Sequence, residues 1–120
     1  MKFVDSRCLP KTLIAITLGF GLAATADAVD EDAARTLAKQ SGCFKCHAVD
    51  KKKEGPAWNT VAEKHKDLST AELEAKLTHH ITSGEKVKFE DGHEEEHKVV
   101  KTDDQAQIKN LVDWIISLKK

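Results

Sequence analysis

Hydrophobic positions recur at helical spacing in three long stretches of the chain. In residues 30–42, 69–83 and 102–118, apolar side chains return every three or four positions, as in a helix packed on one side. A shorter amphipathic segment covers residues 59–66, and no internal repeat is visible. These patterns predict one mostly helical domain. The inward-facing residues of the three stretches are Ala33, Ala34, Leu37 and Ala38; Leu73, Leu77, His80 and Ile81; and Ile108, Leu111, Val112, Ile115 and Leu118.

Polar residues and glycines mark the ends of these predicted helices. The acidic residues 30–32 suit the positive end of a helix dipole, and Gly42 is a typical residue just beyond a helix end. Ser69-Thr70-Ala71-Glu72 reads as a capping box, and Gly84 closes the same helix. Thr102-Asp103-Asp104-Gln105 reads as a second capping box, so we expect the last helix to begin at Thr102.

The segment Cys43-Phe44-Lys45-Cys46-His47 follows the first helix directly. Its spacing matches the attachment signature of covalent c-type haem, in which two thiols bind the vinyl groups of one porphyrin. His47 then becomes the proximal ligand of the haem iron. A zinc site would need a second pair of ligands, and no cysteine follows Cys46. Thioredoxin-like chemistry would need a βαβ context, which is absent. The motif therefore predicts one haem c.

Residues 1–28 read as a secretory signal peptide. Lys2, Arg7 and Lys11 form a basic start, residues 13–26 are mainly apolar, and cleavage is expected near Ala28. An uncleaved anchor is the alternative, but about 14 apolar residues fall short of the roughly 20 needed to span a bilayer. Export combined with covalent haem indicates an oxidising compartment, the bacterial periplasm. Residues 29–120 are then the monohaem domain, with no membrane span.

Composition excludes some function classes. The 120-residue chain has 19 basic and 20 acidic residues, so its balanced charge gives no reason to expect nucleic acid as a partner. A mature domain of about 92 residues is small for an independent core, and a buried haem would supply apolar surface. We see no acid/base pair or nucleophile constellation, and expect no enzymatic activity.

The stretch Gly55-Pro56-Ala57-Trp58 provides further candidate cofactor-binding residues. Proline retains its carbonyl group, and we expect the Pro56 carbonyl to accept a hydrogen bond from the far nitrogen of His47. An ordinary turn proline is the alternative. Trp58 is expected either in the wall of the haem pocket or in the plain core, and its indole could also reach a haem propionate.

Together, these stretches resemble the small class I cytochromes c of bacteria, close to the cytochrome c551 type. The resemblance covers nearly all of residues 29–120: a helix leading into Gly-Cys-x-x-Cys-His, Gly-Pro-Ala-aromatic, a middle helix ending in glycine, and a last helix entered by Thr-Asp-Asp-Gln-Ala-Gln. It implies an all-α class I cytochrome c fold whose N- and C-terminal helices cross around the haem. Trp114 would pack at that crossing.

The far side of the iron departs from this family pattern. The family usually supplies a methionine before the last helix, but the only methionine here is Met1. Counting back from the last helix places the family's methionine near position 96, which favours His97 as the distal ligand, with His93 as the alternative. Further alternatives are His80 or His79, and an open or water-bound iron. We expect His65 to lie on the surface.

The resemblance implies a one-electron carrier that meets redox partner proteins in transient complexes. Histidine in place of methionine stabilises ferrous iron less, so bis-histidine ligation predicts a lowered reduction potential. The alternative is a gas-binding or sensor protein, or a peroxidase-like one, whose sixth iron position is labile or open. A third possibility is a subunit of a larger oxidoreductase.

Overall fold

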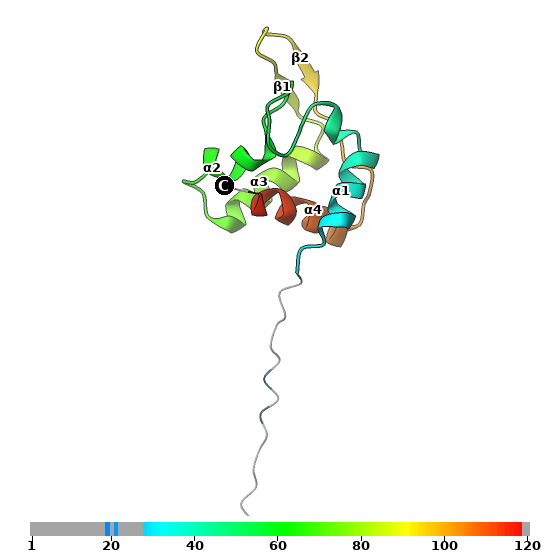
Figure 1. Ribbon diagram of the computed structural model, residues 1–120, viewed down its shortest axis with the longest axis vertical. Helices are drawn as coiled ribbons and strands as arrows, with labels where there is room; N and C mark the ends of the chain where they lie inside the picture. Colours follow the sequence, from blue (N-terminus) through cyan, green and yellow to red (C-terminus); the bar gives the residue numbers. More distant parts are fainter. Residues whose placement is uncertain (1–18, 20, 22–27, 119–120) are drawn as a thin grey trace, which may run out of the picture.

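A computed structural model describes residues 19, 21 and 28–118, so the predicted signal peptide lies almost wholly outside the described residues. Within these residues the elements are four α-helices, two short 3-10 helices and one β-hairpin (Figure 1). In chain order they are α1 (Glu31–Gln40), η1 (Cys43–Lys45), η2 (Trp58–Thr60), α2 (Val61–Lys64), α3 (Thr70–Thr82), β1 (Lys86–Lys88), β2 (Glu94–Glu96) and α4 (Gln105–Ser117). The predicted helical fold is confirmed.

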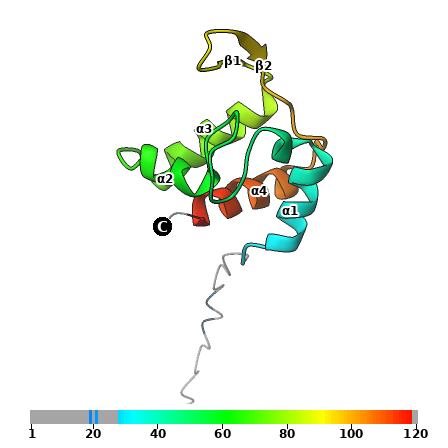
Figure 2. The same cartoon turned by 45° about the horizontal axis from the view of Figure 1, so that its top comes forward.

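The first and last helices pack against each other, as both ribbon views show (Figures 1 and 2). The Asn110 amide, in the middle of α4, joins that helix to the start of α1: its Oδ1 atom accepts from the Asp30 backbone N–H and its Nδ2 atom donates to the Asp30 carbonyl, both at 2.8 Å. Further along, the Arg35 guanidinium lies 4.9 Å from the centre of the Trp114 ring. Trp114 is only 2% exposed, so it is the large buried side chain of this helix contact.

Two of the predicted helix ends are present as expected. In α3, Ser69 Oγ accepts from the Glu72 backbone N–H at 3.3 Å, while the Glu72 carboxylate accepts from the Ser69 N–H at 2.8 Å. This reciprocal pair is a complete capping box. Gly42 follows α1 with φ of 75°, a left-handed conformation that glycine adopts without strain. The chain can therefore turn sharply from α1 into η1.

The start of the last helix differs from the prediction. The N-cap of α4 is Asp104, whose carboxylate accepts from the backbone N–H groups of Ala106 and Gln107. The Thr102 hydroxyl instead accepts from the Asp104 N–H at 3.1 Å. Threonine and aspartate both cap helices well, but the backbone just before Thr102 is held elsewhere, because the Lys101 N–H donates to Ser41 Oγ. The N-cap therefore lies two residues later than predicted, and α4 itself begins at Gln105.

The segment before α4 contains an antiparallel hairpin, which the sequence analysis did not predict. β1 and β2 pair with Lys86 opposite Glu96 and Lys88 opposite Glu94, which places opposite charges side by side. Gly92, with φ of 91°, lies in the turn between them. Asp-Gly is a known hairpin signal that could have revealed this turn. The hairpin extends beyond the helices at one end of the molecule (Figure 1).

The core lies between α1, α3 and α4, and two tryptophans connect it to the rest of the chain. Trp58 from η2 is 5% exposed and meets Trp114 edge-on, with ring centres 5.6 Å apart. The buried core cluster comprises Ala34, Leu37, Ala38, Trp58, Ile81, Val100, Ile108, Leu111, Val112, Trp114 and Ile115.

Candidate functional site

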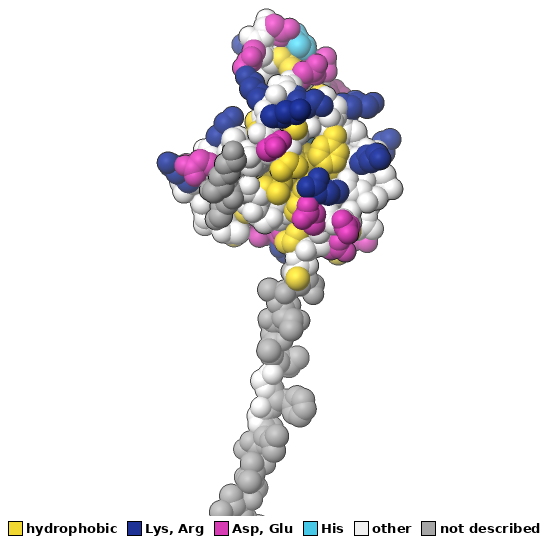
Figure 3. Space-filling view, in the orientation of Figure 1, with side chains coloured by type: hydrophobic (Ala, Val, Ile, Leu, Met, Phe, Trp, Pro, Cys, Tyr) yellow, Lys and Arg dark blue, Asp and Glu magenta, His cyan; other side chains and the backbone are white. Residues whose placement is uncertain are grey.

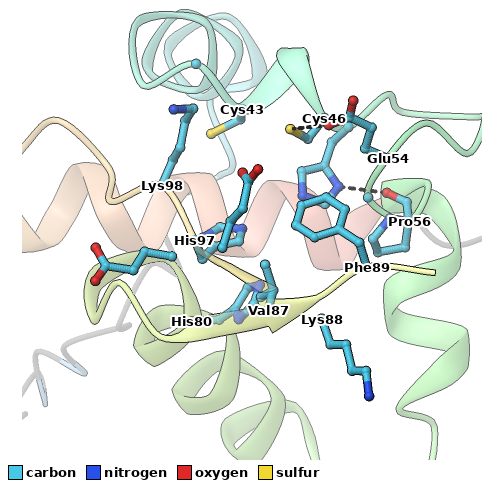
Figure 4. Close-up of a pocket in the computed structure, with 15 residues that line it drawn as sticks. Cys43, Cys46, Glu54, Pro56, His80, Val87, Lys88, Phe89, His97 and Lys98 are labelled. Atoms are coloured by element: carbon cyan, nitrogen blue, oxygen red, sulfur yellow. Dashed lines mark hydrogen bonds between the residues drawn. The ribbon is translucent and has the colours of Figure 1, made fainter. Parts of the chain in front are cut away.

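Cys43, Cys46 and His47 lie on one wall of a hollow next to the end of α1. A single tight turn brings them together, since the N–H groups of Cys46 and His47 both donate to the Cys43 carbonyl, at 3.2 and 3.0 Å. Both cysteines are free and partly buried. Burial raises the pKa of each thiol. Figure 4 shows the two sulfur atoms on the same side of the hollow.

Three neighbours hold the His47 ring in place. Its Nδ1 atom lies 2.8 Å from the Pro56 carbonyl oxygen, so Nδ1 is the donor and Nε2 remains free to accept or bind a metal. Trp58 stacks on the ring, with centres 5.5 Å apart. A Cβ atom at Gly55 would lie 2.4 Å from His47 Cε1, so only glycine fits beneath the ring. Burial lowers the pKa of His47, which favours the neutral form.

The hollow has an outer and an inner part, which share Cys43, His47, Pro56, His80 and His97. The outer part is bordered by Cys46 and by the hairpin. The inner part is mainly apolar, and its wall includes Trp58, Val61, Leu77, Ile81, Leu111 and Ile115. Trp58 therefore belongs both to the wall and to the core, the two places that the sequence left open.

His97 lies across this hollow from His47. The two ring centres are 6.2 Å apart. The backbone N–H of His97 donates to the Glu85 carbonyl at 2.9 Å, which ties the segment after β2 to the end of α3. Burial, followed by the nearby imidazoles of His80 and His47, lowers the pKa of His97. Its Nδ1 atom is buried and has no hydrogen-bond partner among the described residues.

The structure does not bring His93 to the hollow. His93 lies in the turn of the hairpin, where its ring stacks on Phe89 with centres 4.3 Å apart. Its Nδ1 atom contacts the Asp91 carboxylate, and this contact raises the pKa of His93. His93 borders neither part of the hollow described above, so its position, rather than its pairing with Asp91, separates it from the cysteine turn.

The two adjacent histidines of α3 differ in their surroundings. His80 borders both parts of the hollow, and its ring centre lies 4.0 Å from that of His97. Its Nδ1 atom is bonded to the Glu85 carboxylate. The His79 side chain, by contrast, is 69% exposed and borders neither part.

Sequence reasoning missed three residues of the inner hollow, namely His65, Lys76 and Glu85. His65, expected on the surface, is partly buried and lines it, as does Lys76. Lys76 precedes His80 by four positions and therefore shares its helix face, a signal that was available. His65 follows the short α2 helix, where no periodic pattern indicates its direction.

Lysines surround the outer side of the cysteine turn. Lys45 and Lys98 both lie beside Gly42, and the Lys53 ammonium donates to the Phe44 carbonyl. Within the described residues, none of these three lysines has a carboxylate within ion-pair distance. Figure 3 shows basic side chains around an apolar patch on one face of the molecule. Carboxylates are also close, since Cys46 Sγ donates to Glu54 Oε2 at 3.5 Å and Glu95 borders the outer part, so charges of both signs surround the cysteine turn.

These features meet the requirements of covalently attached haem. The two thiols lie on the same wall, and the adjacent imidazole is oriented with its Nε2 atom free. Apolar side chains form the inner wall, and a second neutral imidazole faces the first. Cys43, Cys46 and His47 would hold the group.

Comparisons with known proteins agree with this geometry. The family model for cytochrome c matches residues 31–119. The crystal structure of the class 1 cytochrome MtoD from Sideroxydans lithotrophicus ES-1 is similar, with 59% identity, a TM-score of 0.71, and coverage of 78% of this chain and 100% of that one. Wild-type cytochrome c552 from Nitrosomonas europaea is similar at 29% identity and a TM-score of 0.54, covering 71% of this chain and 99% of that one. No curated protein matched in the corresponding search.

Proposed function

Since this chain belongs to the cytochrome c family and has the class I fold, we propose that it is a periplasmic one-electron carrier with a bis-histidine haem. The observation that carries this proposal is the 6.2 Å separation of the His47 and His97 ring centres across the hollow. Bonds of about 2 Å from a metal to two imidazoles on opposite sides need ring centres roughly 6 Å apart. His47 is then the proximal ligand and His97 the distal one.

The protein's contribution is to hold and tune the group. When bound, the haem c supplies the one-electron chemistry of its iron. Cys43 and Cys46 anchor the group, the Pro56 carbonyl keeps Nε2 of His47 directed at it, and Trp58 excludes water from one side. A second histidine in place of methionine lowers the reduction potential. Carboxylates at the rim, Glu54, Glu85 and Glu95, favour the more positive ferric state and act in the same direction.

One observation favours a second candidate function. The Nδ1 atom of His97 has no partner among the described residues, whereas the matching atom of His47 is held by Pro56. A distal ligand without such a holding bond is more easily released. A sixth position vacated in this way would suit a gas-binding or sensor protein, or a peroxidase-like one.

Location and partners follow from the first proposal. Residues 1–28 act as the signal peptide, cleavage occurs near Ala28, and residues 29–120 form the monohaem domain in the periplasm. None of the helices in the described part of the chain has the length and apolar character needed to cross a membrane. Redox partner proteins would dock briefly at the exposed cysteine edge, and the protein itself would catalyse no bond-making reaction.

Absorption spectra of both redox states, with and without carbon monoxide, separate the two functions. A carrier stays low-spin when oxidised and when reduced, and ignores the gas. A gas-binding protein shows high-spin ferrous iron that takes up carbon monoxide, and this result would overturn the carrier proposal.

Methionine substitutions test the distal ligand. His97→Met should raise the reduction potential and produce the absorption band of an iron–methionine bond. His93→Met is the matched control and should leave the reduction potential and the absorption spectrum unchanged. If His93→Met raises the potential and His97→Met does not, the assignment of His97 is wrong.

A further inference from the structure

We propose that His80 is a reserve distal ligand, which binds the haem iron when His97 leaves it. This inference rests on the proposed function, in which His97 is the resident ligand. His80 would then bind metal itself, in addition to lining the hollow. The iron would then remain six-coordinate in a second state.

Position is the first support. His80 borders both parts of the hollow, and its ring centre lies 4.0 Å from that of His97. The His80 side chain is 33% exposed, so space beside it allows its ring to shift. An imidazole so close to the resident ligand needs only a local movement to enter the vacated position.

The contact with Glu85 is the second support. The His80 Nδ1 atom is bonded to the Glu85 carboxylate, which leaves Nε2 as the free nitrogen, just as the Pro56 carbonyl does for His47. Carboxylate–imidazole pairs are the usual support of metal-binding histidines, because they fix the tautomer and raise ligand basicity. His97 has no such partner among the described residues. The support expected of a metal ligand is therefore built around His80.

The third support is that the two histidines belong to different elements. His97 follows β2 in a segment outside any helix, where its backbone N–H donates to the Glu85 carbonyl. His80 lies inside α3, which is fixed by the buried side chains of Leu73 and Ile81. The reserve ligand therefore stays in place when the resident one leaves.

The exchange is balanced and needs no other reactant. The bond from the iron to the His97 nitrogen breaks, and a bond to the His80 Nε2 atom forms. One imidazole nitrogen replaces another at the iron, so the oxidation state of the iron is unchanged and no electron moves. As a consequence, His80 competes with small molecules such as carbon monoxide for the sixth position when His97 is released, and so slows their binding.

Removal of the resident ligand tests the exchange directly. His97→Ala should stay low-spin in both redox states, with an electron paramagnetic resonance signal and a potential different from those of the native protein. Adding His80→Ala should make the iron high-spin and able to bind carbon monoxide. Adding His79→Ala instead is the matched control and should behave like His97→Ala alone.

Three outcomes of this test oppose the inference in separable ways. High-spin iron in His97→Ala overturns the reserve role but supports His97 as the resident ligand. Low-spin iron that persists in the variant lacking both His97 and His80 also overturns the reserve role. A His97→Ala protein with the native signal and potential means that His97 never bound the iron, so the proposed function itself fails.

A second measurement keeps the native distal ligand in case the double variant does not fold. In the reduced protein, His80→Gln should keep low-spin iron at rest but take up carbon monoxide several-fold faster than the native protein. His79→Gln should match the native rate. Equal rates for the two variants overturn the reserve role. High-spin iron at rest in His80→Gln would make His80 the resident ligand and overturn the assignment of His97.

Discussion

The Nδ1 atom of His47 lies 2.8 Å from the carbonyl oxygen of Pro56, nine residues further along the chain. The loop between them returns closely, because the Gly55 N–H donates to the Cys46 carbonyl at 2.7 Å. Gly55 is the contact point, since a Cβ atom there would lie 2.4 Å from His47 Cε1. The orientation of the His47 imidazole therefore depends on a glycine outside the Cys-x-x-Cys-His motif.

Gly55→Ala should displace the His47 ring. A Cβ atom at this distance overlaps the ring, so the ring or the loop must move, and the bond to Pro56 weakens. We expect a lower yield of protein with attached haem, and a potential altered from the native value, measured by redox titration. A Gly55→Ala protein with native yield and potential would show that the loop absorbs the methyl group and does not fix the ring.

Trp114→Ala should cost about 3–5 kcal/mol of the free energy of unfolding, the usual range for a large aromatic side chain removed from a core. Trp114 is 2% exposed and contacts both Trp58 and Arg35. Denaturant unfolding of the haem-containing protein measures the change. Val99→Ala is the control, because Val99 is 48% exposed and its truncation should cost less than about 0.5 kcal/mol.

His93 should titrate in the haem-containing protein with its pKa above the ordinary histidine value, because Asp91 stabilises its charged form. Asp91→Asn should bring this pKa down. The sign follows from linkage: a pKa raised in the folded state adds stability below the ordinary value of about 6.5, and that stability is lost as the pH rises through the raised pKa. NMR titration of the His93 ring protons measures this pKa in the native protein and in Asp91→Asn. An absence of titration would indicate that His93 is bound to iron.

Lys45→Glu should slow oxidation of the reduced protein by ferricyanide at low ionic strength. Lys45 is exposed and adjoins Cys46, where the haem edge is expected, and an anionic reagent is attracted by positive charge there. The difference should shrink at high salt, where screening is stronger. Lys64→Glu is the control: it changes the net charge equally but lies on α2. Equal slowing by both variants would exclude the cysteine edge as the site of exchange.

The sequence by itself determined features that depend on neighbouring residues. The Cys43-x-x-Cys46-His47 spacing predicts haem attachment because all three groups belong to one turn. The α3 capping box is equally local, because Ser69 and Glu72 satisfy each other's backbone N–H groups. Apolar periodicity predicts the three long helices because each must bury one face. No tertiary information is needed for these conclusions.

Only the tertiary structure decided how His47, His80 and His97 relate to one another. A count along the chain could not separate His93 from His97, because the unrecognised hairpin directs the two side chains to different surroundings. His93 meets Asp91 in the turn, whereas His97 follows β2 and is tied to the end of α3. The start of α4 was likewise decided by distant bonds, from Val100 to Ile81 and from Lys101 to Ser41. Contacts between residues so far apart in the chain arise from the packing of whole elements, which no local pattern encodes.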